Sequence, residues 1–143
     1  MKRFQYTESQ GMAGIPGMLP FVSATLLRIN NAQHITHRQS LPVLVDSGST
    51  VNVLPFDIGK SLGFHWEDCP DTPFIGTVRG APALGVELFV KVAGFPPKRF
   101  VFGWSERPST EIVCIFGQTN FFDEFYVDFR KPRGYFEIAL KDA

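Results

Sequence analysis

The residue with the clearest potential for chemistry is Asp46, which directly follows the apolar run Leu41–Val45. A carboxylate at the end of a buried strand is costly to desolvate unless hydrogen bonds or a function hold it there. Ser47 and Ser49 supply hydroxyl groups that can orient this carboxylate, and Gly48 lets a second backbone approach closely. Taken alone, an Asp-Ser-Gly triplet usually marks only a turn, so the surrounding elements decide its meaning.

The elements around Asp46 are expected to be short β-strands. Phe occurs 15 times, Gly 13 times and Pro 11 times, a combination of bulky aromatic and turn-forming residues that favours a sheet protein. Strands are predicted over residues 21–29, a return through 35, and then 41–45, 51–54, 74–78, 84–92, 99–104, 112–116, 125–129 and 135–140. The runs 41–45 and 112–116 are apolar on both faces, which is typical of wholly buried strands.

Two short helices complete this expectation. Pro55 opens a helix from about Phe56 to Leu62, and Gly63 ends it. Thr119 is positioned to cap a second helix that runs through Glu124. The predicted fold class is therefore mostly β with one or two short helices.

The order and spacing of these elements, from about residue 20 to residue 140, resemble the single-lobe, retropepsin-like aspartic proteases. Three segments carry the likeness: a catalytic loop, a glycine-rich hairpin in the place of the flap, and an apolar-apolar-Gly strand that crosses beneath the loop. Their residues are Asp46, Ser47, Gly48 and Ser49; Gly76, Thr77, Val78, Arg79 and Gly80; and Ile115, Phe116 and Gly117.

This resemblance implies a closed or partly open β-barrel of the acid-protease type and an aspartic endopeptidase activity. Two carboxylates that share one proton would hold a water molecule, one acting as base on the water and the other as acid toward the substrate carbonyl. The chain has only one such motif, because Asp57-Ile58-Gly59 and Asp71-Thr72-Pro73 do not match it. By similarity, the second Asp46 comes from a second subunit across a twofold axis.

The likeness also implies roles for the neighbours of Asp46. Ser47 would hydrogen-bond across the dimer, Gly48 would accept the substrate backbone, and the hydroxyl of Ser49 would donate to the carboxylate and favour an acidic working range. Viral members of that family commonly have a charged pair near the dimer interface at the positions of Thr50 and Gln118. Here either a neutral polar contact replaces that pair or the dimer interface is weaker.

Composition narrows the partners. With 14 basic and 14 acidic residues, the chain lacks the positive charge on which nucleic-acid binders rely. No apolar run approaches the roughly 20 residues that span a bilayer. No signal peptide is expected, because no apolar run follows the basic residues Lys2 and Arg3. Cys69 and Cys114 are too few for a disulfide framework. A cytoplasmic location without membrane contact is expected, with peptide or protein substrates.

Rival chemistries find little support in the sequence. His34 and His37 lie three residues apart, a spacing that faces opposite sides of a strand, so no metal site is expected there. His65 and Cys69 lack ligand spacing as well, and the Gly-x-Ser-x-Gly motif of serine hydrolases is absent. Neither a metal nor another cofactor is predicted.

The expected organisation is an N-terminal arm over residues 1–19, either flexible or at the dimer interface, followed by one retropepsin-like domain over residues 20–143. Two alternatives to a constitutive protease stay open. In the first alternative, the chain is a noncatalytic β-barrel module that binds extended peptides in the same groove. In the second, the dimer forms only under particular conditions and the monomer is inactive. The intact Asp-Ser-Gly-Ser loop favours the protease, because a module without catalysis has no need of a buried aspartate.

Overall fold

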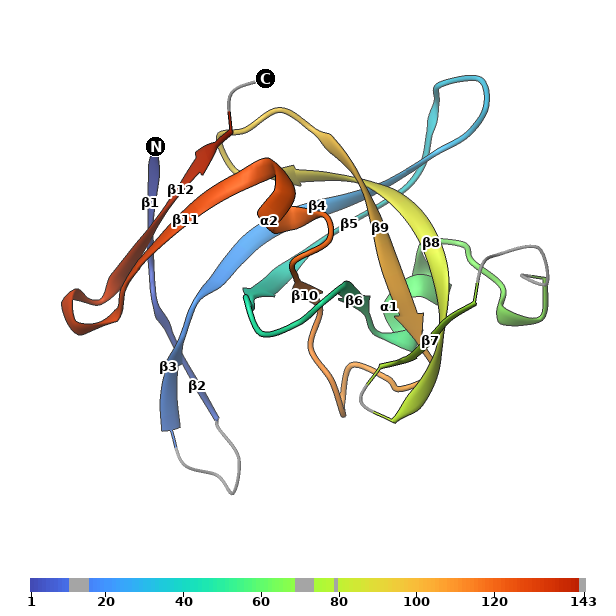
Figure 1. Ribbon diagram of the computed structural model, residues 1–143. Helices are drawn as coiled ribbons and strands as arrows, with labels where there is room; N and C mark the ends of the chain where they lie inside the picture. Colours follow the sequence, from blue (N-terminus) through green and yellow to red (C-terminus); the bar gives the residue numbers. More distant parts are fainter. Residues whose placement is uncertain (11–15, 69–73, 79, 142–143) are drawn as a thin grey trace.

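The computed structural model describes residues 1–10, 16–68, 74–78 and 80–141 (Figure 1). The strands are β1 (Lys2–Gln5), β2 (Thr7–Gln10), β3 (Pro16–Leu19), β4 (Phe21–Ile29), β5 (Ile35–Val45), β6 (Asn52–Leu54), β7 (Phe74–Val78), β8 (Ala81–Val92), β9 (Lys98–Ser105), β10 (Ile115–Phe116), β11 (Phe125–Arg130) and β12 (Tyr135–Leu140). The helices are α1 (Phe56–Ser61) and α2 (Phe121–Glu124), and the 3₁₀ turns are η2 (Trp66–Asp68) and η3 (Lys131–Arg133).

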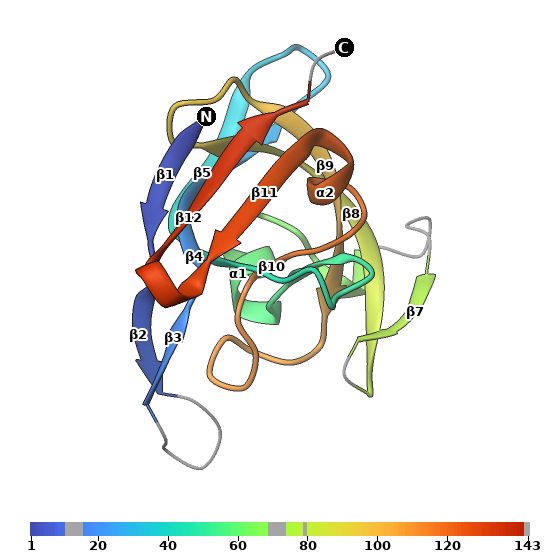
Figure 2. The same ribbon diagram turned by 60° about the vertical axis from the view of Figure 1, so that its left-hand side comes forward.

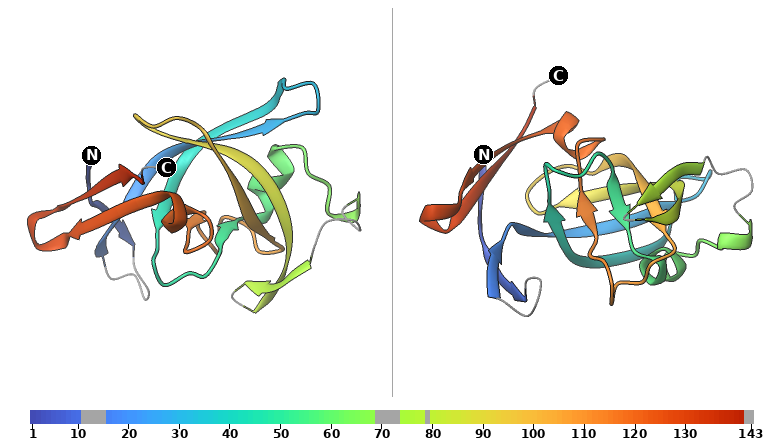
Figure 3. Two further views of the ribbon diagram at one scale, coloured as in Figure 1. Left: turned by 45° about the horizontal axis from the view of Figure 1, so that its top comes forward. Right: turned by 60° about the horizontal axis from the view of Figure 1, so that its bottom comes forward.

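The main sheet closes into a barrel of six strands. Its strand order is β4-β5-β10-β6-β9-β8, and pairing of β4 with β8 closes the ring. β7 lies outside the ring (Figure 3) and, among the described strands, pairs only with β8. The prediction of a mostly β chain with a closed barrel and two short helices is therefore confirmed.

A second sheet packs beside the barrel. It has the strand order β1-β12-β11, and the hairpin β2–β3 extends from its lower end (Figure 2). Three strands thus lie in the segment predicted as an arm, where the sequence has no period that would reveal them. β1 pairs in register with β12, Arg3 opposite Glu137 and Phe4 opposite Phe136. The Tyr6 side chain is buried in the core.

The core is rich in aromatic rings that connect the two sheets. Phe116 of β10 stacks on Phe121 of α2 with ring centroids 4.7 Å apart, and Phe121 stacks on Phe125, the first residue of β11, at 4.8 Å. All three side chains are buried. Offset and stacked rings of this kind add to the free energy gained from burial alone. The column of rings therefore connects β11 of the second sheet to β10 of the barrel.

Three local predictions need correction. Residues 35–45 form one strand, and residues 41–45 are not wholly buried, because Pro42 is exposed between the core residues Leu41 and Val43. The predicted buried strand 112–116 shortens to Ile115–Phe116. The residue before α2 is Asn120 rather than Thr119, and its side chain accepts a hydrogen bond from the Val101 N–H instead of capping the helix.

Other elements follow their sequence signals closely. β4 and β12 have the predicted bounds, and β7–β8 form the predicted hairpin. α1 ends at Ser61, and Gly63 adopts a φ of +86°, the left-handed conformation that glycine adopts without strain. Among the described residues, no helix is long and apolar enough to cross a membrane.

Gly59 allows α1 to pack directly on the barrel. The indole of Trp104 is fully buried against the helix and donates a hydrogen bond to the Phe56 carbonyl at 3.1 Å. A Cβ atom on Gly59 would come within 2.1 Å of the indole nitrogen. No side chain can be added at this position unless the helix or Trp104 moves.

We predict that Gly59→Ala lowers the free energy of unfolding by about 1–3 kcal/mol, the usual cost of overpacking a core. Gly17→Ala is the matched control, because a Cβ on Gly17 meets nothing within 4 Å. Urea unfolding followed by Trp fluorescence measures both variants. Equal stability of Gly59→Ala and the parent chain would contradict the close packing of Trp104.

Candidate active site

Asp46 lies immediately after β5, where the chain leaves the barrel. Its backbone N–H donates to the Phe116 carbonyl at 3.0 Å, which continues the pairing between β5 and β10. Its side chain is partly buried, and Oδ1 accepts a hydrogen bond from the Gly48 N–H at 2.9 Å. The Ser49 N–H donates to the Asp46 carbonyl at 3.1 Å and closes a tight turn. One backbone donor, the Gly48 N–H, therefore holds the carboxylate, as expected for a short polar loop.

The strand β10 and Gly117 lie directly beneath this loop. Ile115 and Phe116 are buried, and β10 pairs in parallel with β5 and antiparallel with β6. A Cβ atom on Gly117 would lie 2.3 Å from the Val51 carbonyl oxygen, so only glycine fits here. The segment predicted to cross beneath the loop thus touches it, and Asp46–Ser49 and Ile115–Gly117 come together as one unit.

Asn52 ties the loop to two other strands. This side chain is fully buried; Nδ2 donates to the Val101 carbonyl at 3.0 Å, and Oδ1 accepts from the Gly117 N–H at 2.8 Å. Its backbone N–H donates to the Thr119 carbonyl at 3.1 Å. Sequence reasoning misses this residue, although a lone amide between Val51 and Val53 in a buried strand is a usable signal, because buried polar groups must find partners.

Gln118 holds the loop through two hydrogen bonds within one chain. Its side-chain Nε2 donates to the Ser47 carbonyl at 2.7 Å, and its backbone N–H donates to the Ser49 carbonyl at 2.8 Å. The Thr119 N–H donates to the Thr50 carbonyl in the same ladder. The residues after Gly117 therefore hold the loop along its whole length.

One predicted role within the loop differs in the structure. The Ser49 hydroxyl donates to the Val51 carbonyl at 2.7 Å rather than to the Asp46 carboxylate. In this turn the Gly48 N–H donates to Oδ1 of Asp46, and the Ser49 hydroxyl lies against the Val51 carbonyl. Ser49 therefore does not favour an acidic working range through a hydrogen bond to the carboxylate.

The predicted flap residues lie on the hairpin formed by β7 and β8. Gly76, Thr77 and Val78 belong to β7, with Thr77 opposite Pro82 and Val78 opposite Ala81. Arg79 lies outside the described residues. Gly80 has a φ of +79°, as the tip of a tight hairpin requires. β7 and the beginning of β8 lie on the same side of the barrel as the loop that follows β5 (Figures 1 and 3).

Two ionisable groups next to the loop region have shifted pKa values. At the start of α1, partial burial of Asp57 acts to raise the pKa of its carboxyl, but hydrogen bonds from the Ser109 hydroxyl (2.5 Å) and backbone N–H (2.6 Å) outweigh it and lower that pKa. Burial raises the pKa of the Cys114 thiol to about 12. Cys114 is therefore an inert core thiol rather than a nucleophile.

Two cavities lined by described residues lie beside Phe21. They measure about 400 and 320 Å³, share Phe21 and Pro42 in their walls, and are not lined by Asp46. The part of the chain that the structure describes holds no group of three or more His, Cys, Asp or Glu side chains able to bind a metal ion. No family model, curated protein or solved structure matches this chain. Functional inference therefore rests on the geometry of the loop.

We predict that Asn52→Ala destabilises the fold strongly, because it leaves the buried Gly117 N–H and the partly buried Val101 carbonyl without their partner, at about 1–3 kcal/mol for a fully buried group. Chemical denaturation measures the loss. Asn31→Ala, in an exposed turn, serves as the control and should stay within about 0.5 kcal/mol of the parent. A similarly small effect of Asn52→Ala would show that the loop does not depend on this amide.

A second prediction concerns Asp57. Because its pKa is lower in the folded state, its contribution to stability is present above the pKa of the unfolded chain and disappears as the pH falls through the folded-state pKa. Asp57→Asn should therefore cost about 0.5–1 kcal/mol at pH 7, a modest value because the group is exposed. The cost should shrink below about pH 4. Unfolding curves recorded from pH 7 to pH 3 test this, and a cost independent of pH would contradict it.

Proposed function

We propose that this chain is an aspartic endopeptidase that works as a homodimer, with one Asp46 from each subunit. The observation that carries the proposal is the way the Asp46 loop is held: Gly48 N–H on the carboxylate, and Gly117 packed against the loop from below. A carboxylate fixed in this manner at the end of a barrel strand is pre-organised, which is what general acid–base chemistry requires.

The proposed mechanism needs two such carboxylates close together. Two carboxylates side by side cannot both ionise easily, so the pair retains one proton. The ionised member takes a proton from a bound water molecule, which attacks the peptide carbonyl, while the protonated member donates to the carbonyl oxygen. In the described part of the chain, the Asp46 carboxylate accepts a hydrogen bond from the Gly48 N–H at Oδ1, and the proposed mechanism uses Oδ2 for the contact with water.

Apolar side chains next to Asp46 support an apolar peptide as substrate. Leu44 and Val51 lie on either side of the Asp46 loop and are partly buried. They cover a small buried apolar cluster that is separate from the main core and consists of Val53, Ala83, Ile112 and Ile115. Extended peptides with bulky apolar residues at the cleaved bond are therefore the expected substrates.

We predict that Asp46→Asn abolishes peptide hydrolysis while the fold survives. The substitution preserves size and removes both acid and base roles, since a symmetric dimer carries it twice. Each role is worth about 10²–10⁴-fold in rate. Cleavage of a library of apolar peptides, followed by mass spectrometry between pH 4 and pH 7, measures the effect.

Asp123→Asn, in the exposed first turn of α2, is the matched control and should cleave like the parent chain. If Asp46→Asn cleaves as fast as the parent, the proposal is wrong. If the parent binds the peptides without cutting them and Asp46→Asn binds equally well, the chain is the noncatalytic peptide-binding module instead.

A further inference from the structure

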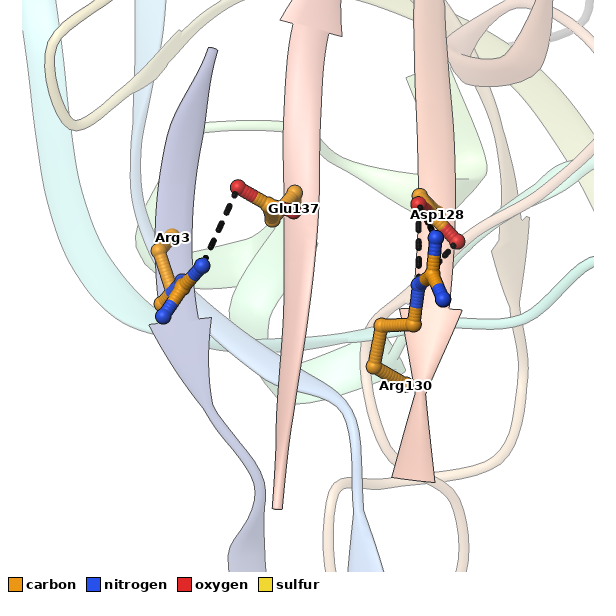
Figure 4. Close-up of polar contacts among 4 residues, drawn as sticks. All are labelled: Arg3, Asp128, Arg130 and Glu137. Carbon is orange, nitrogen blue, oxygen red and sulfur yellow. Dashed lines mark hydrogen bonds and ion pairs between the residues drawn. The ribbon is translucent and has the colours of Figure 1, made fainter. Parts of the chain in front are cut away.

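The edge strand β11 carries exposed aromatic and charged side chains. Among the described strands, β11 pairs with β12 alone, so one of its sides has no neighbouring strand. Two of its aromatic side chains are exposed, Tyr126 at 61% and Phe129 at 39%. An exposed sheet edge with apolar side chains is a ready template for another strand. Figure 4 shows the charged side chains of β11, Asp128 and Arg130, and their charges indicate what kind of strand can pair with this edge.

Alternation along β11 separates its side chains onto two faces. Phe129 lies opposite Phe136, which is fully buried, and the two rings are 6.3 Å apart. Phe129 therefore belongs to the inner face and is exposed because the sheet ends there. Asp128 and Arg130 belong to the outer face, where the Arg130 guanidinium contacts the Asp128 carboxylate at 3.0 Å.

The same face also holds an ion pair that lies away from the edge. Arg3 of β1 and Glu137 of β12 approach to 3.7 Å (Figure 4). Glu137 lies on the central strand of the three-stranded sheet, and Arg3 lies on the opposite edge strand. Because this ion pair lies on the same face but away from the edge of β11, it supplies a control for experiments on the Asp128–Arg130 pair.

Few registers allow β11 to pair with a copy of itself. In an antiparallel pair related by a twofold axis, side chains that lie opposite each other must point to the same face. An axis through Asp128 or Arg130 puts like charges opposite each other, which is unfavourable. An axis through Val127 puts Arg130 opposite Glu124, which belongs to α2 rather than to a strand. An axis through Phe129 puts Asp128 opposite the partner subunit's Arg130, twice.

We propose that a second copy of this chain pairs along the free edge of β11, antiparallel, about a twofold axis at Phe129. Two cross-strand ion pairs form, Asp128 with the partner subunit's Arg130 and the reverse, and the two Phe129 rings cover each other. Isologous contacts of this type close into dimers rather than filaments.

The position of β11 also suits a dimer that brings two Asp46 loops together, and this step of the inference rests on the proposed function. β11 is the edge strand on the side of the three-stranded sheet toward the loop that follows β5 (Figure 2). Gln118, which holds that loop, precedes α2, and α2 leads directly into β11. The stack of Phe116, Phe121 and Phe125 makes this connection rigid. Pairing at β11 therefore fixes how the two Asp46 loops approach each other.

The test exchanges charges between chains. Asp128→Arg places two arginines on the outer face of β11, and Arg130→Asp places two aspartates there. In either variant alone, each cross-strand pair becomes repulsive, and we expect the dimer dissociation constant to rise at least about tenfold at low salt. In an equal mixture, every cross-strand pair is again attractive, so a heterodimer of parent-like affinity should form. Analytical ultracentrifugation with one chain fluorescently labelled measures all three samples.

The mixture separates the proposed contact from the contact within one chain. The Asp128–Arg130 pair of each variant chain stays repulsive in the mixture, so only a contact between chains can restore association. Arg3→Glu is the control: it makes the Arg3–Glu137 pair repulsive but lies on β1, so the dissociation constant should not change. A Phe129→Cys chain in a Cys69→Ser background should form a disulfide with its copy under mild oxidation, because opposite residues lie within disulfide reach.

A parent chain that is monomeric at all concentrations, or a mixture that does not associate, would overturn the β11 interface. A disulfide at Val127→Cys instead of Phe129→Cys would overturn the register. Failure of the proposed function gives a different result: the mixture associates, but neither it nor the parent chain cleaves peptides. If the chain cleaves peptides as a dimer but neither charge variant changes the dimer dissociation constant, the proposed protease function stands and the β11 interface is wrong.

Discussion

The hydrogen bonds of the buried Asn52 side chain hold together the segments on which the candidate site depends. One amide bonds to the Val101 carbonyl of β9 and to the Gly117 N–H that follows β10. In the fully buried environment of this side chain, an unpaired amide or backbone group would cost far more than the bond contributes. The network therefore favours one arrangement of β6, β9 and β10. Because the Asp46 loop lies between β5 and β6 and contacts Gly117, its conformation depends on that arrangement.

Apolar packing extends this order from the loop to the edge of the molecule. Below the loop, the aromatic stack that begins at Phe116 ends at Phe125, the first residue of β11. A continuous series of contacts thus joins the backbone of Asp46 to β11, whose outer edge pairs with no other strand in the described part of the chain. We call this series the path. The proposals for catalysis and for self-association use the two ends of this path. A site with one carboxylate is incomplete for water activation by a carboxylate pair, and an unpaired edge with complementary charges offers a way to complete it.

Much of the architecture was within reach of sequence reasoning. The bounds of β4 and β12, the hairpin β7–β8 and the end of α1 shortly before Gly63 follow from alternation and turn residues, which are local signals. The strands among residues 1–19 were not, because β1 is specified by its partner β12 rather than by its own pattern. The position of Asp46 at a strand end was predictable. The roles of Asn52 and Ser49 were not, since both depend on which carbonyl or amide lies nearby in three dimensions.

The central claim is that two Asp46 carboxylates serve one site, and subunit mixing tests it most directly. Parent chains and Asp46→Asn chains are combined at a fixed total concentration and allowed to exchange, and peptide cleavage is measured against the fraction of parent chain. If both carboxylates are needed, only parent homodimers cut, and an equal mixture retains about one quarter of the activity. If each chain holds a complete site, activity falls in proportion to the parent fraction and about one half remains, which would contradict the account.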